Sequence, residues 1–144
     1  MKLRQLLEKA SKRLGLYEAL DLELERFNRM AYLTPTLKIT GIPISIDKKI
    51  QIIIFRILQE LFTNTIKHSK ATHLDVALVY ENDTLFVKVK DNGVGFNYDS
   101  ALSKNGIGLS NIDSRIKLIG ASIDFQSTAG AGTEVSLTYK PKHL

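Results

Sequence analysis

Three polar residues stand at helical spacing in the middle of the chain: Glu60, Asn64 and Lys67. Because these positions are four and then three residues apart, an α-helix would carry all three on one face. A carboxylate, an amide oxygen and an ammonium group together suit a Mg²⁺ ion surrounded by phosphate, since Mg²⁺ prefers oxygen ligands and keeps several waters. A solvated polar helix face has the same composition, so this triplet alone leaves both interpretations open.

A second group, Asp91-Asn92-Gly93-Val94-Gly95-Phe96, follows a segment in which apolar residues alternate with polar ones. Glycines at alternate positions let a ligand approach the backbone closely. The Asp91 carboxylate, at the end of the predicted strand, is suited to accept a hydrogen bond from an amino group. Asp-Asn-Gly is also an ordinary turn sequence, so a simple turn is the alternative.

Two further glycine-containing segments follow. Asn105-Gly106-Ile107-Gly108-Leu109 opens a predicted helix whose free N–H groups would form an anion site, or would only cap the helix after a soft loop. The chain has no phosphate loop of the GxxxxGKS or GxxxxGKT type, and Tyr98 and Asn111 replace the third glycine of a dinucleotide fingerprint. Gly132-Thr133 begins the last predicted strand, where the hydroxyl would support a buried polar group or simply favour β-structure.

The elements that must position these residues follow from hydrophobic periodicity. Period 3.6 predicts a helix from about residue 16, with a buried stripe from Tyr17 to Ala31, a second from the N-cap Asp47 to about His68, and a third over 109–118 that ends at Gly120. Period two predicts strands over 37–40, 74–80, 85–89, 123–126 and 134–139. Helices segregated from antiparallel strands indicate an α+β two-layer sandwich.

Length and composition restrict the class of protein. A chain of 144 residues predicts one folded domain, and 44% hydrophobic with 24% charged residues is typical of a soluble globular protein and not of a disordered one. The absence of cysteine excludes disulfides, thiol nucleophiles and cysteine-ligated metal sites. The longest apolar run is 52–55 and no basic, apolar leader opens the chain, so we expect a cytoplasmic location.

The net charge of +5 does not predict nucleic-acid binding, because of where the charge lies. The first thirteen residues carry a net +4, the last five a net +2, and everything between a net −1. A nucleic-acid footprint would gather basic residues on one face of the folded body. We therefore expect no nucleic-acid partner.

The four polar and glycine-containing segments, taken in order, resemble a known family: the GHKL ATPases, specifically the catalytic ATP-binding domain of bacterial sensor histidine kinases. The segment 59–68 resembles the N box, Asp91-x-Gly93-x-Gly95-Phe96 the G1 box, Gly106-x-Gly108-Leu109 the G2 box, and Gly130-x-Gly132-Thr133 the last element. The segments 14–20 and 67–71 are most similar to the subfamily that includes nitrate- and membrane-fluidity-sensing kinases. The resemblance covers about residues 14–140.

The resemblance implies a mixed, mainly antiparallel sheet backed by three helices, with ATP and Mg²⁺ bound between helix and sheet. It implies that Asn64 holds Mg²⁺, that Asp91 accepts the adenine amino hydrogen, and that Thr133 supports this contact through water. The remaining ATP-binding residues that it implies are Lys67 and His68 at the phosphates, Gly93, Gly95 and Phe96 around the purine, and Gly106, Ile107, Gly108 and Leu109 at the phosphate tail, with 92–108 as a lid.

Two of these roles have structural alternatives. Glu60 occupies the position that polarises the attacking group in family members, with a possible share in the metal site; the alternative is a structural acid paired with Arg56 or Lys67. His68 would contact phosphate, although a lone histidine is often structural.

The resemblance also implies partners. Residues 1–14 would be the linker from a missing dimerisation and phosphoacceptor hairpin, 15–140 the catalytic domain and 141–144 a tail. The chain's histidines are His68, His73 and His143, and none lies in such a hairpin. We therefore expect a monomer that transfers the γ-phosphoryl group of ATP to a histidine of a separate dimerisation domain, which in turn serves a response regulator, as the cytoplasmic part of a two-component system.

Three other functions fit the same fold. A non-catalytic nucleotide-sensing or docking module would keep Asp91 and the glycines but would not need Glu60. A serine kinase that antagonises a sigma factor fits the segment 67–68 less well. An ATP-operated clamp of the gyrase or mismatch-repair kind needs a transducer domain after the last strand.

Overall fold

The structure is a computed structural model, and it describes residues 15–95, 109–128 and 130–142. The predictions made for 1–14, Phe96, Gly106, Ile107 and Gly108 lie outside these ranges. The elements in chain order are α2 (Leu16–Arg29), β1 (Thr34–Thr40), α3 (Lys48–Asn64), the π-helical turn η1 (Thr65–Ser69), β2 (His73–Glu81), β3 (Thr84–Asp91), α5 (Leu109–Ile119), β4 (Ser122–Thr128) and β5 (Gly132–Tyr139). None of the described helices has the length and apolar character to span a membrane.

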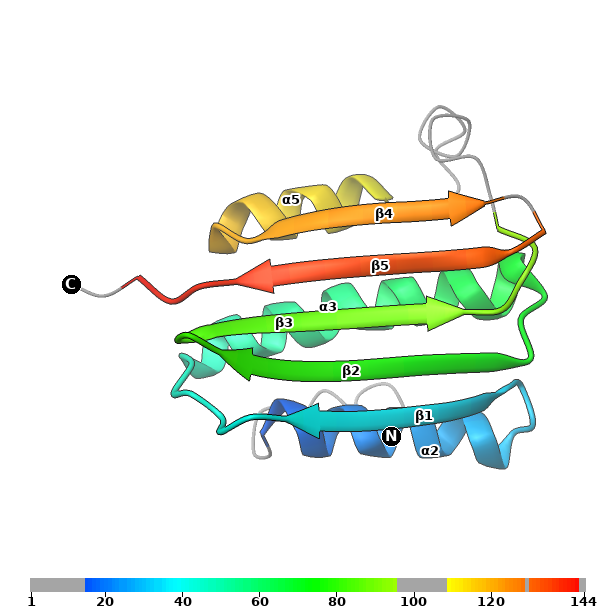
Figure 1. Cartoon of the computed structure of the whole chain (residues 1–144), viewed down its shortest axis with the longest axis horizontal. Helices are drawn as coiled ribbons and strands as arrows, with labels where there is room; N and C mark the ends of the chain where they lie inside the picture. The colour runs from blue at the N-terminus through cyan, green and yellow to red at the C-terminus, as the bar shows by residue number, and fades with distance from the viewer. Residues whose placement is uncertain (1–14, 96–108, 129, 143–144) are drawn as a thin grey trace, which may run out of the picture.

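The five strands form one sheet in the order β1-β2-β3-β5-β4, and the helices lie on one side of it (Figure 1). The pair β1 and β2 is parallel, whereas β2 with β3, β3 with β5, and β5 with β4 are antiparallel. This confirms the α+β two-layer fold with a mixed, mainly antiparallel sheet. The arrangement brings the end of β3 beside the start of β5, with the end of α3 behind them.

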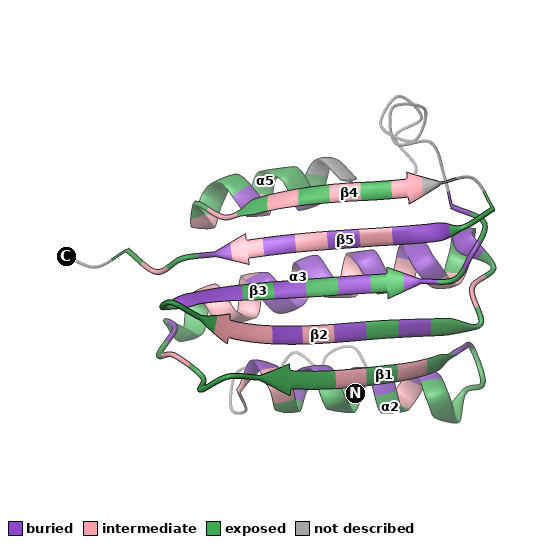
Figure 2. Ribbon diagram, viewed as in Figure 1, coloured by how far each residue is buried: buried purple, intermediate pink, exposed green. Residues whose placement is uncertain are grey.

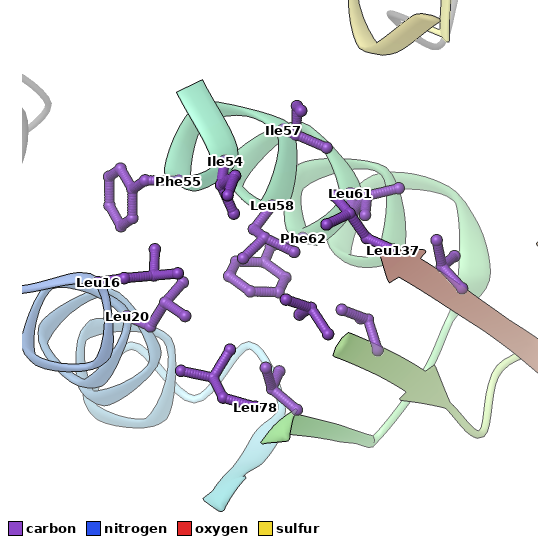
Figure 3. Close-up of a cluster of buried hydrophobic side chains, with 14 of the residues drawn as sticks. Leu16, Leu20, Ile54, Phe55, Ile57, Leu58, Leu61, Phe62, Leu78 and Leu137 are labelled. Atoms are coloured by element: carbon purple, nitrogen blue, oxygen red, sulfur yellow. The ribbon is translucent and has the colours of Figure 1, made fainter. Parts of the chain in front are cut away.

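The core lies between the sheet and the helices. Burial alternates along β2 and β3, which shows that one face of the sheet is covered and the other faces solvent (Figure 2). Helix α3 is the centre of the buried layer (Figure 3), and Phe62 meets Phe27 of α2 edge-on, with ring centroids 6.0 Å apart. The fully buried side chains include Leu20, Ile54, Ile57, Leu58, Phe62, Leu74, Leu78, Leu85 and Leu137.

A buried carboxylate joins the two larger helices. Glu23 of α2 is only 2% exposed, and its Oε1 accepts hydrogen bonds from Arg26 Nε at 3.1 Å and Nη2 at 2.5 Å. Its Oε2 accepts a third from Gln59 Nε2 of α3 at 3.1 Å. Because a buried charge without partners is costly, this network fixes α2 against the helix that carries the candidate site.

The predicted helix ends are largely confirmed. Asp47 caps α3, with its Oδ1 accepting Lys49 N–H at 2.8 Å. Gly120, at φ 68°, ends α5, and the bonds from Gly120 N to Lys117 O and from Ala121 N to Ile116 O form a Schellman motif.

The predictions for the first helix and the first strand were wrong in detail. Ala31 is not on the buried stripe of the first helix, because α2 ends at Arg29 and Ala31 is exposed at φ 56° in the turn toward β1. The first strand begins at Thr34, before the predicted residue 37, and includes Pro35. Proline is tolerated there because β1 is an edge strand, with a side free of ladder hydrogen bonds.

Candidate nucleotide-binding site

A small pocket lies where the ends of α3 and β3 meet the start of β5. Its volume is about 10 Å³, enough for about one water molecule and too small to hold a whole ligand. Its walls combine four buried polar side chains with an apolar lining: Leu61, Asn64, Thr65, Val89, Asp91, Phe125, Thr133 and Val135. The structure thus brings together three of the residues predicted from sequence, namely Asn64, Asp91 and Thr133.

The Asp91 carboxylate is 6% exposed and held at one oxygen. Its Oδ1 accepts the Gly93 N–H at 2.8 Å, whereas its Oδ2 lies 3.5 Å from the Thr65 hydroxyl. That hydroxyl also lies 3.1 Å from the Leu61 carbonyl and has one hydrogen to give. The Oδ2 atom therefore keeps acceptor capacity for a donor that enters the pocket.

Thr133 is the register partner of Asp91 in the pairing of β3 with β5. Thr133 is 5% exposed, and its hydroxyl lies 3.1 Å from the hydroxyl of Ser127 on β4. Gly132 makes this close pairing possible: it has φ 89°, and a Cβ atom there would lie 2.1 Å from the Asp91 carbonyl oxygen. A side chain at this position would push β5 away from the site.

The predicted polar helix face is divided between two kinds of helix. Glu60 and Asn64 lie one turn apart on α3, with Asn64 8% exposed as the last α-helical residue. Lys67 and His68 belong to the π turn and are exposed, so the expected α-helix up to His68 was wrong. A π turn has a wider hydrogen-bond spacing and changes the direction of the residues that follow, and such turns are frequent at functional sites.

Serine and threonine hydroxyls accompany this change of helix type. The Thr65 hydroxyl donates to Leu61 O and the Ser69 hydroxyl to Thr65 O at 2.6 Å, each one turn back. Such back-bonding competes with the regular helix and bends it. Lys70, in the left-handed conformation at φ 57°, then ends the segment.

The surroundings of the Glu60 carboxylate bear on its two alternative roles. Its carboxylate is half-buried, and within the part of the chain that the structure describes it makes no ion pair with Arg56 or Lys67. The described ranges also contain no group of three or more His, Asp or Glu side chains that would hold a metal without phosphate. The amide oxygen of Asn64 could supply only one of the ligands of Mg²⁺. Phosphate and water oxygens would have to complete the coordination shell.

Sequence reasoning missed four residues that shape the site: Thr65, Ser69, Asn92 and Ser127. Thr65 and Ser127 contact the predicted residues Asp91 and Thr133 directly. Ser69 is 1% exposed, although its neighbours Lys67 and His68 are exposed. Only its place after two polar residues at a helix end could have drawn attention to it. Gly93 and Gly95 are buried, with the Gly93 N–H bonded to Asp91, and Leu109 is described only as the first backbone position of α5.

A sequence profile of the family described as histidine kinase-, DNA gyrase B- and HSP90-like ATPases matches residues 49–143. The chain belongs to this family of ATPases. The matched range contains every residue that lines the pocket, from Leu61 to Val135.

The curated relatives are sensor kinases. An uncharacterized sensor-like histidine kinase of Chloroflexus aurantiacus is 36% identical, over 65% of this chain and 17% of that protein. The sensor protein VraS of Staphylococcus aureus is 37% identical, over 64% of this chain and 26% of that protein. The chain therefore spans between about a sixth and a quarter of the length of these relatives.

Solved structures share the fold. The histidine kinase AdeS of Acinetobacter baumannii superposes with a TM-score of 0.72 at 19% identity, covering 94% of this chain and 74% of that one. The histidine kinase domain of the Erythrobacter litoralis blue-light activated kinase EL346 superposes with a TM-score of 0.71 at 18% identity, covering 88% and 65%. These matches confirm the predicted fold class.

Proposed function

We propose that this domain binds Mg²⁺-ATP and transfers the γ-phosphoryl group to a histidine of a dimerisation domain, in two-component signalling. The observation that carries the proposal is the buried Asp91 carboxylate in the wall of the pocket that Thr133 and Asn64 also line, with one oxygen held by Gly93 N–H and the other 3.5 Å from the hydroxyl of Thr65, a further wall residue. A ligand recognised there would need a hydrogen-bond donor for the Asp91 carboxylate. It would also need an anionic group for the Mg²⁺ ion that Asn64 would hold.

Adenine meets the first requirement. Its 6-amino group donates a hydrogen bond, whereas the 6-oxo group of guanine would be repelled by the carboxylate. Thr133 lines the same pocket and would complete the contact through a water molecule, and Gly93 would contribute through its N–H, which holds the Asp91 carboxylate.

Asn64 would hold Mg²⁺ through its amide oxygen, and the ion would neutralise charge on the phosphates when bound. Lys67 and His68 are exposed on the π turn that follows Asn64, where they would contact the phosphate tail. Glu60, one helical turn before Asn64 and without an ion-pair partner in the described ranges, would polarise the attacking imidazole by accepting the hydrogen of its other ring nitrogen.

The transfer itself makes one bond and breaks one. The acceptor imidazole nitrogen forms a bond to the γ-phosphorus, the bond between that phosphorus and the bridging oxygen breaks, and ADP leaves with the electron pair. The acceptor in this proposal is a histidine of a second domain and not His68, His73 or His143 of this chain.

Thermal unfolding with and without Mg²⁺-ATP tests the binding step. A ligand that binds the folded state at a hundred times its Kd stabilises it by about 2.7 kcal/mol, which raises the midpoint by several degrees. Asn64→Ala should lose most of this rise when Mg²⁺ is present and little of it when Mg²⁺ is absent. A wild-type midpoint that ATP does not move would contradict the proposal.

Transfer is tested by supplying a purified dimerisation domain and ATP labelled at the γ-phosphate. We expect a phosphoryl label that acid removes and alkali preserves, as for phosphohistidine, whereas an acid-stable label would indicate the serine-kinase alternative. Glu60→Gln should slow transfer at least about tenfold while leaving the ATP Kd unchanged. Full transfer activity in Glu60→Gln would favour a structural role for this carboxylate.

A further inference from the structure

Asn92, between the candidate adenine acceptor Asp91 and Gly93, has no role in the function proposed so far. Its side chain is exposed but makes four hydrogen bonds to Thr72 and His73, at the start of β2. Its Oδ1 accepts both the Thr72 N–H and the His73 N–H at 2.9 Å, and its Nδ2 donates to the Thr72 hydroxyl at 2.8 Å and lies 3.3 Å from His73 Nδ1. A side chain that satisfies two consecutive backbone amides fixes the loop after β3 to the neighbouring segment.

The same loop is held from its other side by the π turn. Val94 N–H donates to Ser69 O at 2.7 Å, and Ser69 is itself held by its hydroxyl, which donates to Thr65 O and accepts from Ala71 N at 3.1 Å. Gly93 packs so closely here that a Cβ atom would lie 2.3 Å from the Ser69 carbonyl oxygen. Segment 92–94 is therefore clamped between η1 and the start of β2.

This clamp determines where the Asp91 carboxylate points. Gly93 N–H is the donor to Asp91 Oδ1, so a displacement of Gly93 would release that oxygen and let the carboxylate rotate. We propose that Asn92 is a positioning residue for nucleotide recognition, which holds Gly93 in place and thereby keeps Asp91 Oδ2 directed into the pocket. This inference rests on the proposed function, since it assigns Asn92 to the recognition of the purine.

Asn92→Ala and Asn92→Asp separate this role from a general effect. Alanine removes all four side-chain bonds, whereas aspartate keeps an oxygen for both amides and can accept the Thr72 hydroxyl hydrogen. By titration calorimetry, Asn92→Ala should weaken Mg²⁺-ATP binding about tenfold, and Asn92→Asp should stay within about twofold of the wild type. Mg²⁺-GTP binding should change little, so the preference for ATP over GTP should fall in Asn92→Ala.

Asn82→Ala is the matched control. Asn82 lies in the hairpin turn at the opposite end of β2 and β3 at φ 52°, so alanine there is strained and should lower the unfolding midpoint. Its Kd for ATP and its preference for ATP over GTP should remain those of the wild type. A lowered midpoint in Asn92→Ala with unchanged Kd and preference would overturn the inference and leave Asn92 a structural residue.

Thr72→Val decides the matter if Asn92→Ala does not fold. It removes the shorter of the two Nδ2 contacts of Asn92 but keeps the His73 ring and both backbone amides, so ATP binding and nucleotide preference should fall by about twofold to threefold. Unchanged values in this variant would then contradict the inference. A wild-type chain that binds neither nucleotide would contradict the proposed function, and the role of Asn92 with it.

Discussion

Asp91 and Thr133 are register partners on β3 and β5, and both side chains are buried in the wall of one pocket, at 6% and 5% exposure. They are 42 positions apart in the sequence, and only the antiparallel pairing of the two strands brings them together. A carboxylate and a hydroxyl side by side offer two acceptors and one donor, a set that can read the edge of a purine.

Asp91→Asn should abolish this recognition with little damage to the fold. The amide oxygen of asparagine can still accept Gly93 N–H, but its NH₂ group would then face the pocket and the adenine amino group. Because hydrogen bonds to charged groups contribute about 1.5–3 kcal/mol, we expect ATP binding to weaken by about tenfold to a hundredfold. Calorimetry measures the loss, and an unchanged circular dichroism spectrum shows that the fold is retained. Wild-type affinity in this variant would rule out Asp91 as the adenine acceptor.

Gly132→Ala should be much more disruptive than Gly130→Ala. Both glycines have positive φ, 89° and 80°, so alanine strains the backbone by about 1–3 kcal/mol at either position. At Gly130 no atom lies within 4 Å of the added Cβ, whereas at Gly132 it would meet the Asp91 carbonyl oxygen at 2.1 Å. Denaturant unfolding should show a loss at Gly132 that exceeds the loss at Gly130 by at least about 1 kcal/mol. Equal losses would mean that β5 can move away from β3 without cost.

Much of this arrangement was predictable because it depends on local patterns. The alternation in β2 and β3, the cap Asp47 and the terminating Gly120 each follow from residue types within a few positions. The order of the polar and glycine segments predicted the family and three pocket residues. The π turn was not predictable, because Thr65 and Ser69 bind carbonyls only one turn away and such hydroxyls also occur in regular helices. The contact of Ser127 with Thr133 depends on strand register, which sequence alone does not give.

Ser127→Ala should weaken ATP binding through Thr133. The two hydroxyls are 3.1 Å apart, so Ser127 restricts the direction in which the Thr133 hydroxyl points. Loss of one neutral hydrogen bond costs about 0.5–1.5 kcal/mol of free energy, which predicts a rise of about twofold to tenfold in the ATP Kd. Ser136→Ala on β5, whose side chain is half-buried farther along the sheet, is the control and should leave the Kd unchanged. Equal Kd values in all three proteins would mean that Thr133 acts without Ser127.

Alkaline pH should destabilise the domain partly through Tyr80, whose pKa is raised above the ordinary 10.0 by burial and, to a lesser extent, by the nearby Glu18 carboxylate. Above about pH 10 the unfolded chain releases this proton while the folded chain keeps it, so the free energy of unfolding falls as pH rises. Tyr80→Phe removes this contribution and should show a smaller loss of stability between about pH 9 and pH 11. At pH 7 Tyr80 is protonated in the folded and in the unfolded chain. A difference in stability between wild type and Tyr80→Phe at this pH therefore reflects packing alone and serves as the baseline.

Glu23→Ala should separate the two helices that Glu23 joins. The substitution leaves Arg26 and Gln59 without their shared carboxylate and creates a gap at a position that is 2% exposed. Breaking a buried pair by removing one partner costs about 3–5 kcal/mol, and Arg26 is partly exposed, so we expect a loss near 2–3 kcal/mol in denaturant unfolding. Glu25→Ala, at an exposed position of the same helix, should change stability by less than about 0.5 kcal/mol. If the two variants are equally stable, water replaces the carboxylate between α2 and α3, and the position of Asn64 on α3 does not depend on this network.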